Sequence, residues 1–375
     1  MSAPETLVLK FGGTSVRDAA AREAALRRVR ARAASGRRLV LVVSAMGRKG
    51  EPYATDTLIG LLAAAGEPVS PRELDLAMSA GELLAAALFA HQLSLAGLPA
   101  QAFTGPQAGV LTDDRAGEAE ILGVTPTRVA ACLAAGRIAV VAGFQGADRE
   151  GEIRTLGRGG SDTSAVALGA ALGAAEVEIY TDVPGVADAD PRRVTGARFL
   201  AELGASAMLA MAEEGSKVVH PRAVRAALPT ATPLRVLSSF DNGEGTLVHH
   251  RPPVGPPRPL ALAHRGGLVL LRTREPGLEV LDPELLPLGE GRYLAPDDHA
   301  LAVRVARLAA AGHQIRRERG WATLSLVFSG PGVTAPALPD AVPLAAPADR
   351  CRWLLPESAL DAALAVLHAS QLAGG

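Results

Sequence analysis

The chain has 375 residues, of which 48% are hydrophobic and 3% aromatic, and its 38 Lys and Arg residues almost balance 39 Asp and Glu residues. This length suits two globular domains, and the composition argues against a disordered chain, collagen or a disulfide scaffold. A formal net charge of −1 gives no basic surface for nucleic acid, so no nucleic-acid partner is expected.

Lysine occurs only as Lys10, Lys49 and Lys217, so arginine fills nearly every basic position. A codon or thermal bias explains the arginines but leaves open why three lysines remain. An ammonium is a compact point charge that a guanidinium does not replace.

Residues 1–5 contain neither the basic region nor the apolar core of a signal peptide, and the weakly polar run 163–175 is too short to span a bilayer. Cys132 and Cys351 are isolated and lack metal-like spacing, which suits a reducing compartment. We therefore expect a soluble, cytoplasmic protein without a membrane partner.

Short β-rich runs alternate with helical stretches through the first part of the chain. Strands are expected at 7–9, 39–43, 138–142 and 177–180, and helices at 19–35, 71–95 and 162–173. The continuous apolar run at 39–43 is typical of a parallel strand buried on both faces. This alternation indicates an α/β fold, in which ligands bind beyond the carboxyl ends of the strands.

A Pro-rich segment, 251–259, cannot sustain a helix or a central strand and predicts a domain boundary. The pattern is weaker beyond it. Strands are expected at 267–272 and 323–328, a helix at 298–311, a loop at 334–348 and a final helix at 357–372.

The first motif is KFGGTS at 10–15, between a strand and a helix. Paired glycines let backbone N–H groups approach phosphate oxygens, and Lys10 adds a mobile cation. The alternative is a tight turn without a ligand. The adjacent rare lysine favours phosphate binding.

The second motif, TLGRGGSDT at 155–163, places three glycines before a helix start. This composition predicts a loop close to a ligand. Arg158 suits a bidentate hold on a carboxylate, whereas Asp162 taken alone is explained by helix N-capping.

The third motif, 180–192, directly follows a buried strand, and its composition fits either turns or a nucleotide site. In the fourth, EGSKVVHP at 214–221, Lys217 lies in a Gly-Ser turn. Two lysines near one phosphate would stabilise both the donor and the migrating group. His220, before a proline, is interpreted as a helix-start or packing residue.

Together these segments resemble the aspartate kinases of the amino-acid-kinase superfamily, almost continuously over residues 5–248. The matching segments are KFGGTSV at 10–16, VVSAMGRKGEPYATDTL at 42–58, SAGE at 79–82, FTGPQAGVLT at 103–112, VAGFQG at 141–146, TLGRGGSDTSAVAL at 155–168, TDVPGV at 181–186, EGSKVVHPRAV at 214–224, LRVLSSF at 234–240 and GTLV at 245–248.

The resemblance implies that Lys10 and Lys217 stabilise the phosphates during transfer and that Asp162 organises them. The positions implied to surround ATP are Lys10, Gly12, Gly13, Thr14, Ser15, Tyr180, Thr181, Asp182, Asp190, Arg192 and Lys217. Those implied to hold aspartate are Ser44, Thr55, Glu82, Arg158, Ser161 and Asp162. Arg158 would hold the α-carboxylate and Glu82 the ammonium group. Lys49 matches no functional position and is interpreted as a solvated loop lysine.

The reaction implied is transfer of the γ-phosphoryl group of Mg-ATP to the side-chain carboxylate of L-aspartate, giving 4-phospho-L-aspartate. This is the first step toward lysine, threonine, methionine and diaminopimelate. Mg²⁺ would arrive with ATP, so no resident metal site is implied. The resemblance also implies a homodimer.

The implied fold is a catalytic domain at 1–250, with a mainly parallel sheet between helices, followed by a smaller α+β domain of the ACT type at 260–375. The family normally carries two ACT modules, for which residues 258–375 are short. Segments 260–264, 330–334 and 353–372 resemble pieces of them. We expect a degenerate domain kept for dimer contacts and stability, with lysine, threonine or diaminopimelate left open as effector.

Two alternatives remain. One is a sister kinase acting on glutamate or an N-acetylated amino acid, although an anionic Glu82 favours a free ammonium over an acetamide. The other is a catalytically silent regulatory subunit or amino-acid sensor, which would have no use for Lys10, Asp162 and Lys217.

Overall fold

The computed structural model describes residues 4–48, 50–66, 68–274, 278 and 285–373. The chain divides into two compact units. The first comprises Met1–Val186, Phe199–Leu209 and Lys217–Arg251, and the second comprises Ala187–Arg198, Ala210–Ser216 and Pro252–Gly375. The chain passes from the first unit to the second for the last time between Arg251 and Pro252, within the Pro-rich segment 251–259. The functional domain limits expected from the sequence stay a prediction.

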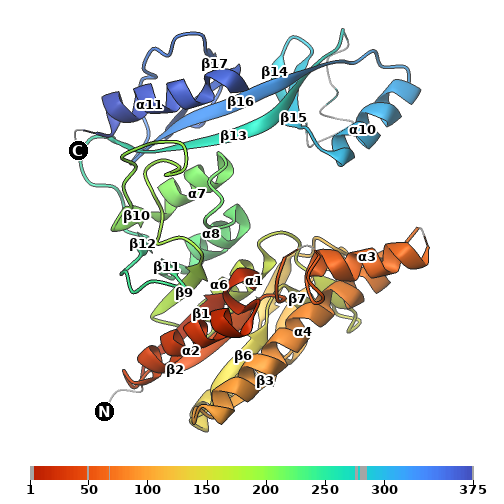
Figure 1. Ribbon diagram of the computed structural model, residues 1–375, viewed down its shortest axis with the longest axis vertical. Coiled ribbons are helices and arrows are strands. Elements are labelled where there is room, and N and C mark those ends of the chain that lie inside the picture. The colour runs from red at the N-terminus through yellow and green to blue at the C-terminus, as the bar shows by residue number, and fades with distance from the viewer. Residues whose placement is uncertain (1–3, 49, 67, 275–277, 279–284, 374–375) are drawn as a thin grey trace. The chain divides into compact units, whose positions relative to one another are not determined.

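An eight-stranded sheet forms the centre of the first unit, in the order β10-β12-β11-β9-β1-β2-β6-β3 (Figure 1). Its strands are β1 (Thr6–Phe11), β2 (Arg38–Val43), β3 (Ala100–Phe103), β6 (Ile138–Ala142), β9 (Glu176–Thr181), β10 (Glu202–Gly204), β11 (Leu234–Ser238) and β12 (Thr246–His249). Every neighbouring pair is parallel except β11 and β12. The expected α/β fold with a mainly parallel central sheet is confirmed.

The helices that begin in this unit are α1 (Gly13–Val16), α2 (Ala19–Ala33), α3 (Thr55–Ala65), α4 (Pro71–Leu95), α5 (Thr127–Ala134), α6 (Gly160–Ala171), α7 (Ala205–Glu213) and α8 (Pro221–Ala227), with short 3₁₀ turns η1 (Pro106–Ala108) and η2 (Leu228–Thr230). A second, four-stranded sheet has the order β5-β4-β7-β8. Its strands are β4 (Val110–Thr112), β5 (Ile121–Val124), β7 (Gln145–Ala147) and β8 (Ile153–Thr155).

Side-chain alternation along β1 separates the two faces of the central sheet. Leu9 and Phe11 enter the apolar core shared with α2 and α4. Lys10, which points to the opposite face, meets Asp162 of α6. Because alternate strand residues face opposite sides, a single charged residue can stand at the end of an otherwise apolar strand and reach the α6 face.

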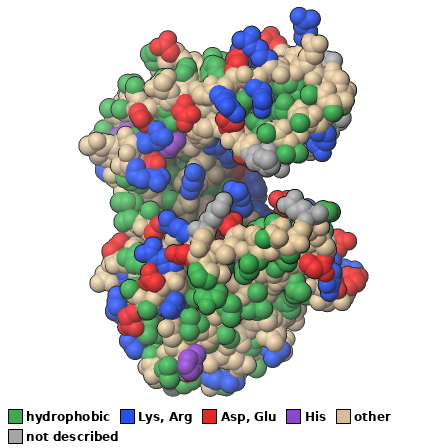
Figure 2. Space-filling view, turned by 45° about the vertical axis from the view of Figure 1, so that its right-hand side comes forward, with side chains coloured by type: hydrophobic (Ala, Val, Ile, Leu, Met, Phe, Trp, Pro, Cys, Tyr) green, Lys and Arg blue, Asp and Glu red, His purple; other side chains and the backbone are tan. Residues whose placement is uncertain are grey.

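Helix α4 is the one helix in the described residues that is long and apolar enough to cross a membrane by length and composition. Half of its apolar stretch is buried, and it also buries Asp75 and Glu82, as a core helix does. Several leucines of α3 and α4 remain exposed, among them Leu61 and Leu95. Figure 2, which brings this side forward, shows hydrophobic side chains gathered over these helices.

The second unit contains a six-stranded antiparallel sheet in the order β14-β15-β13-β16-β18-β17. Its elements are β13 (Pro259–Arg272), β14 (Leu286–Gly289), β15 (Arg292–Pro296), α10 (His299–Ala310), β16 (Arg316–Phe328), β17 (Val342–Leu344), β18 (Arg350–Pro356), η3 (Glu357–Ala359) and α11 (Leu360–Gln371). The expected smaller α+β domain of ACT-like type is confirmed.

Two large apolar cores pack against this sheet, and a third, smaller one contains Leu268, Leu294 and Leu354. One large core joins Val269 and Leu271 of β13 to Leu301 of α10, and the other joins Leu326 of β16 to Leu364 of α11. The expectation of a loop throughout 334–348 is wrong, because β17 pairs there with β18. A three-residue strand in a Pro- and Ala-rich stretch carries too little alternation to be recognised.

Candidate active site

A cavity of about 360 Å³ opens in the first unit, where β1 and β2 end and α6 begins. The residues that line it are Lys10, Gly13, Ser44, Ala45, Gly47, Thr55, Glu82, Phe144, Gly157, Arg158, Gly159, Gly160, Ser161 and Asp162. All six residues assigned to the amino-acid substrate are among them. The cavity lies where the α/β topology predicts ligand binding, beyond the carboxyl ends of parallel strands.

Lys10 and Asp162 form an ion pair on one wall of this cavity. The ammonium Nζ lies 2.6 Å from Asp162 Oδ1, and both side chains are about nine-tenths buried, with exposed fractions of 12% and 11%. Asp162 is not the N-cap of α6, as the alternative interpretation held, because the helix begins at Gly160 and Gly159 takes the cap position. Its carboxylate is therefore available to hold the lysine.

The paired glycines bring the backbone close to its neighbours. A Cβ at Gly13 would lie 2.7 Å from the carbonyl oxygen of Ala45, whereas one at Gly12 would make an ordinary 3.4 Å contact with Lys10 Nζ. Thr14 is half-buried beside them. Ser15 is fully buried and accepts a 2.6 Å hydrogen bond from Ser239, so its hydroxyl is occupied inside the protein.

Glu82 is the most unusual charge-bearing group of the cavity. The Ala45 N–H donates to Oε1 at 3.0 Å, but Oε2 is buried and has no hydrogen-bond partner in the part of the chain that the structure describes. Burial raises the pKa of Glu82 to about 8. An unpaired buried carboxylate is costly, and a cationic ligand group would satisfy it.

Arg158 brings a positive charge into the cavity that also contains the Glu82 carboxyl. Its side chain is exposed, and no hydrogen bond or ion pair holds it among the described residues. The adjacent Gly159 has φ +73°, and a Cβ there would overlap the ring of His220, so this loop requires glycine. Ser44, Thr55 and Ser161 add hydroxyl groups to the cavity wall.

The segment after β9 is predicted to surround the nucleotide, and its side chains differ in exposure. Tyr180 is buried, stacks on Phe11 with ring centroids 4.8 Å apart and donates a 2.8 Å hydrogen bond to Glu178. Burial raises the pKa of its hydroxyl. Its side chain thus belongs to the core. Asp182 is exposed and pairs with Arg48 at 3.2 Å.

Of the residues predicted to surround ATP, nine do not line the cavity: Gly12, Thr14, Ser15, Tyr180, Thr181, Asp182, Asp190, Arg192 and Lys217. Lys217 is exposed, and no ion pair is found for it within the described ranges. Asp190 and Arg192 belong to the second unit and pair with each other at 2.9 Å. Hydrogen bonds from Arg192 hold the pKa of Asp190 below its ordinary value. Lys49 lies outside the described residues. His220 caps the start of α8, as expected.

Three cavity residues were missed by sequence reasoning. Ala45 and Gly47 contribute backbone, and Phe144 has the positive φ of +70°, rare outside glycine. Its carbonyl accepts from Leu156 N–H at 2.8 Å, which fixes the strained turn beside the Gly-rich loop. The available signal was that Phe144 lies two residues after the buried strand β6.

The described residues contain no group of three or more His, Cys, Asp or Glu that could hold a metal ion.

The sequence profile of the amino acid kinase family matches residues 5–238. The chain belongs to this family. The glycine-rich loops and the Lys10–Asp162 pair of this amino acid kinase lie within the matched range.

Curated relatives are aspartokinases. Aspartokinase 1 of Bacillus subtilis is 48% identical over 251 residues, which are 66% of this chain and 62% of the relative. Aspartokinase of Thermus thermophilus is 47% identical over 242 residues, 64% of this chain and 58% of the relative. These matches therefore span about three fifths of each relative's length.

Among solved structures, Escherichia coli aspartokinase III in complex with aspartate and ADP is similar to the chain with a TM-score of 0.78 and 26% identity. The similarity covers 97% of this chain and 99% of that one. A second structure of the same protein, with lysine and aspartate, has a TM-score of 0.75 at 26% identity and covers 98% and 100% of the two chains.

Proposed function

We propose that this amino acid kinase is an aspartate kinase, which transfers the γ-phosphoryl group of Mg-ATP to the side-chain carboxylate of L-aspartate. The names of its relatives support the substrate. The observation that carries the proposal is the cavity itself, because it combines a buried lysine, a free arginine and a buried carboxylate with one unpaired oxygen.

The charges of the cavity suit a free amino acid. Glu82 offers an unpaired oxygen to an ammonium group, and Arg158 offers a planar fork to the α-carboxylate. An N-acetylated substrate has no ammonium group, so it would not stabilise the ionised form of Glu82. The two groups together thus select a zwitterion and leave its side-chain carboxylate free to react.

Phosphoryl transfer to a carboxylate requires no general base, because the acceptor is already ionised at neutral pH. The site must instead align donor and acceptor and stabilise charge on the transferring group. Lys10, held by Asp162, provides a fixed ammonium for the phosphates. Lys217 is the second phosphate contact in this proposal.

In this proposal the nucleotide lies against the residues after β9, with Thr181 and Asp182 beside it. Mg²⁺ arrives with ATP as part of the substrate. The Asp182 carboxylate pairs with Arg48 at an exposed position, so a bound nucleotide can replace this ion pair.

The second unit is proposed to be a degenerate ACT-like domain that stabilises a cytoplasmic homodimer. Its single antiparallel sheet holds two large apolar cores and a small one in a stretch that is short for two complete modules. Ultracentrifugation of the purified chain tests the dimer.

A coupled assay of ADP formation with a panel of amino acids tests the proposed reaction. We expect turnover with L-aspartate and little with L-glutamate or N-acetylated amino acids. Turnover only with an acetylated acid would favour the sister-kinase alternative, and no turnover with any acid would favour a sensor.

A further inference from the structure

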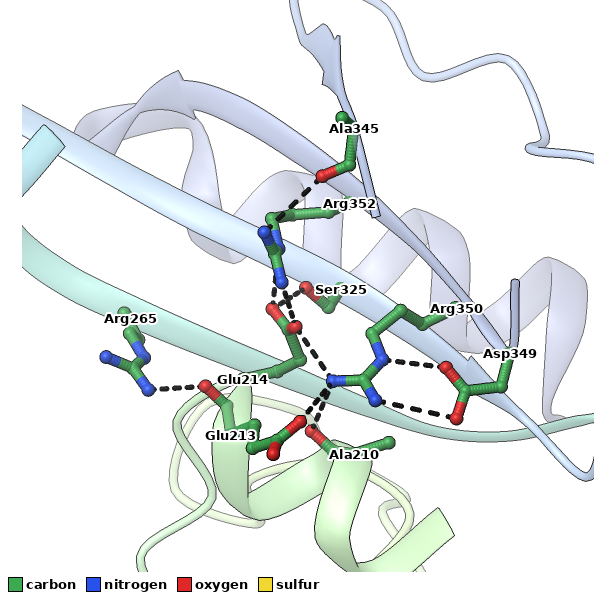
Figure 3. A network of polar contacts seen from close by, with 9 residues as sticks. All are labelled: Ala210, Glu213, Glu214, Arg265, Ser325, Ala345, Asp349, Arg350 and Arg352. Atoms are coloured by element: carbon green, nitrogen blue, oxygen red, sulfur yellow. Dashed lines mark hydrogen bonds and ion pairs between the residues drawn. The ribbon is translucent and has the colours of Figure 1, made fainter. Parts of the chain in front are cut away.

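A buried ionic cluster fixes the segment that precedes Lys217. It consists of Glu213, Glu214, Ser325, Asp349, Arg350 and Arg352, all in the second unit, and is called here the Glu214 network (Figure 3). Lys217 itself begins the next segment of the first unit, three residues after Glu214.

Glu214 is the centre of this network. Its side chain is 3% exposed and accepts hydrogen bonds from Ser325 Oγ at 2.6 Å, Arg352 Nε at 2.8 Å and Arg350 Nη1 at 3.1 Å. Burial opposes its charged form, but hydrogen bonds from Arg352 and Ser325 hold the pKa of Glu214 below its ordinary value. The carboxylate is thus ionised and fully engaged at neutral pH.

Arg350 extends the network to the end of α7. Its side chain is 6% exposed and pairs with Glu213 at 3.0 Å and with Asp349 at 2.9 Å. It also donates to the carbonyl oxygen of Ala210 at 3.5 Å. Figure 3 shows both arginines of β18 directed at the carboxylates at the C-terminal end of α7.

The backbone of the same segment is also held. Arg265 of β13 donates to the carbonyl oxygen of Glu213. Gly215 has φ +116°, and a Cβ there would lie 2.7 Å from Arg265 Cγ and overlap the His264 carbonyl. Contacts to β13, β16 and β18 therefore hold this turn.

We propose that Glu214 is a positioning residue for Lys217: its network fixes the turn from which Lys217 extends. This inference rests on the proposed function, in which Lys217 contacts phosphate. A flexible, exposed lysine contributes to transfer only if its backbone is fixed, because misplacement of a charge by about 1 Å can cost roughly a hundredfold in rate. Buried ion pairs add little net stability but can specify one geometry.

The test compares Glu214→Gln with the parent chain in the aspartate kinase assay. Glutamine keeps the size and one acceptor oxygen but removes the charge that holds both arginines. We expect kcat to fall roughly tenfold or more, while the KM for aspartate changes little, because Glu82 and Arg158 lie in other segments. Equal kcat in a folded Glu214→Gln protein would overturn the inference.

A double-mutant cycle separates positioning from general damage. If Glu214 acts through Lys217, Glu214→Gln causes no further loss of kcat in a Lys217→Met background. A full additional loss in that background would overturn the inference. If Glu214→Gln does not fold, Arg352→Lys, which keeps the charge but loses the fork, takes its place in the same cycle.

Leu271→Ala is the matched control, since Leu271 is fully buried in the other core of the same unit. It should lower the unfolding midpoint and leave kcat unchanged well below that midpoint. Wild-type protein that does not phosphorylate aspartate would overturn the proposed function and the inference with it. A Lys217→Met protein with wild-type kcat would remove the role of Lys217 and the inference, leaving the reaction intact.

Discussion

Lys10 of β1 and Asp162 of α6 form a 2.6 Å ion pair although 152 positions separate them in the sequence. The pair joins the end of the first strand to the first turn of the helix that follows the Gly-rich loop. The ion pair fixes the Lys10 ammonium at the cavity wall. A guanidinium differs from this ammonium in shape and reach.

Lys10→Arg should keep the charge and lose most of the turnover. The larger planar guanidinium cannot occupy the ammonium's place beside Asp162 and Gly12, so the charge is displaced from the phosphates. We expect kcat to fall by about a hundredfold or more, measured by ADP release. Lys49→Arg is the matched control and should leave turnover unchanged. Near-wild-type turnover of Lys10→Arg would refute the assignment.

Stability should respond to pH through Glu82. Burial raises the pKa of this carboxyl to about 8, from 4.5. The folded protein therefore binds the proton more tightly than the unfolded chain, so this contribution is complete below about pH 4.5 and is lost as pH rises through 8. Relative to Glu82→Gln, the wild type should lose about 1.4 kcal/mol of unfolding free energy per pH unit within that window. Urea unfolding at pH 6, 7 and 8 measures this, and parallel curves for both proteins would contradict it.

Aspartate binding should release a proton near pH 7. The empty site holds Glu82 protonated, and an ammonium beside Oε2 favours the ionised form. Calorimetric titration in two buffers of different ionisation enthalpy measures the release. Glu82→Gln should bind more weakly and without proton release, whereas equal release from both proteins would place the linkage elsewhere.

Gly13→Ala should destabilise the protein more than Gly12→Ala. A Cβ at Gly13 would lie 2.7 Å from the Ala45 carbonyl oxygen, while one at Gly12 meets the mobile end of Lys10 at 3.4 Å. Overpacking against backbone costs about 1–3 kcal/mol. Denaturant unfolding of both variants gives the comparison, and equal stability would show that the 45–47 turn moves freely.

Amino-acid effectors should have little influence on turnover if the second unit is a degenerate regulatory domain. Activity is to be titrated with lysine, threonine and diaminopimelate at subsaturating aspartate. Unchanged rates support the degenerate interpretation. Strong inhibition at low effector concentration would show that a regulatory site survives.

Much of the fold was predictable from local pattern. The apolar runs at 39–43 and 138–142 became β2 and β6, and the helix expected at 71–95 has those limits in the structure. Helix α3 was not predicted, because it is apolar but buries none of its residues and so lacks a clear inward face. The strands of the four-stranded sheet, β4, β5, β7 and β8, are too short to show an alternation of apolar and polar residues.

The sequence by itself determined which reactive groups are present: three lysines in an arginine-rich chain and two glycine-rich loops. The family resemblance assigned six residues to the amino-acid substrate, and all six line one cavity. Tertiary structure decided what each group can do there. It buried Glu82 with one oxygen unpaired and held Glu214 with arginines. The physical reason is that burial and ion pairing depend on partners distant in sequence. Ala45 and Glu82 are 37 positions apart, and Glu214 and Arg352 are 138 apart, so no local pattern contains them.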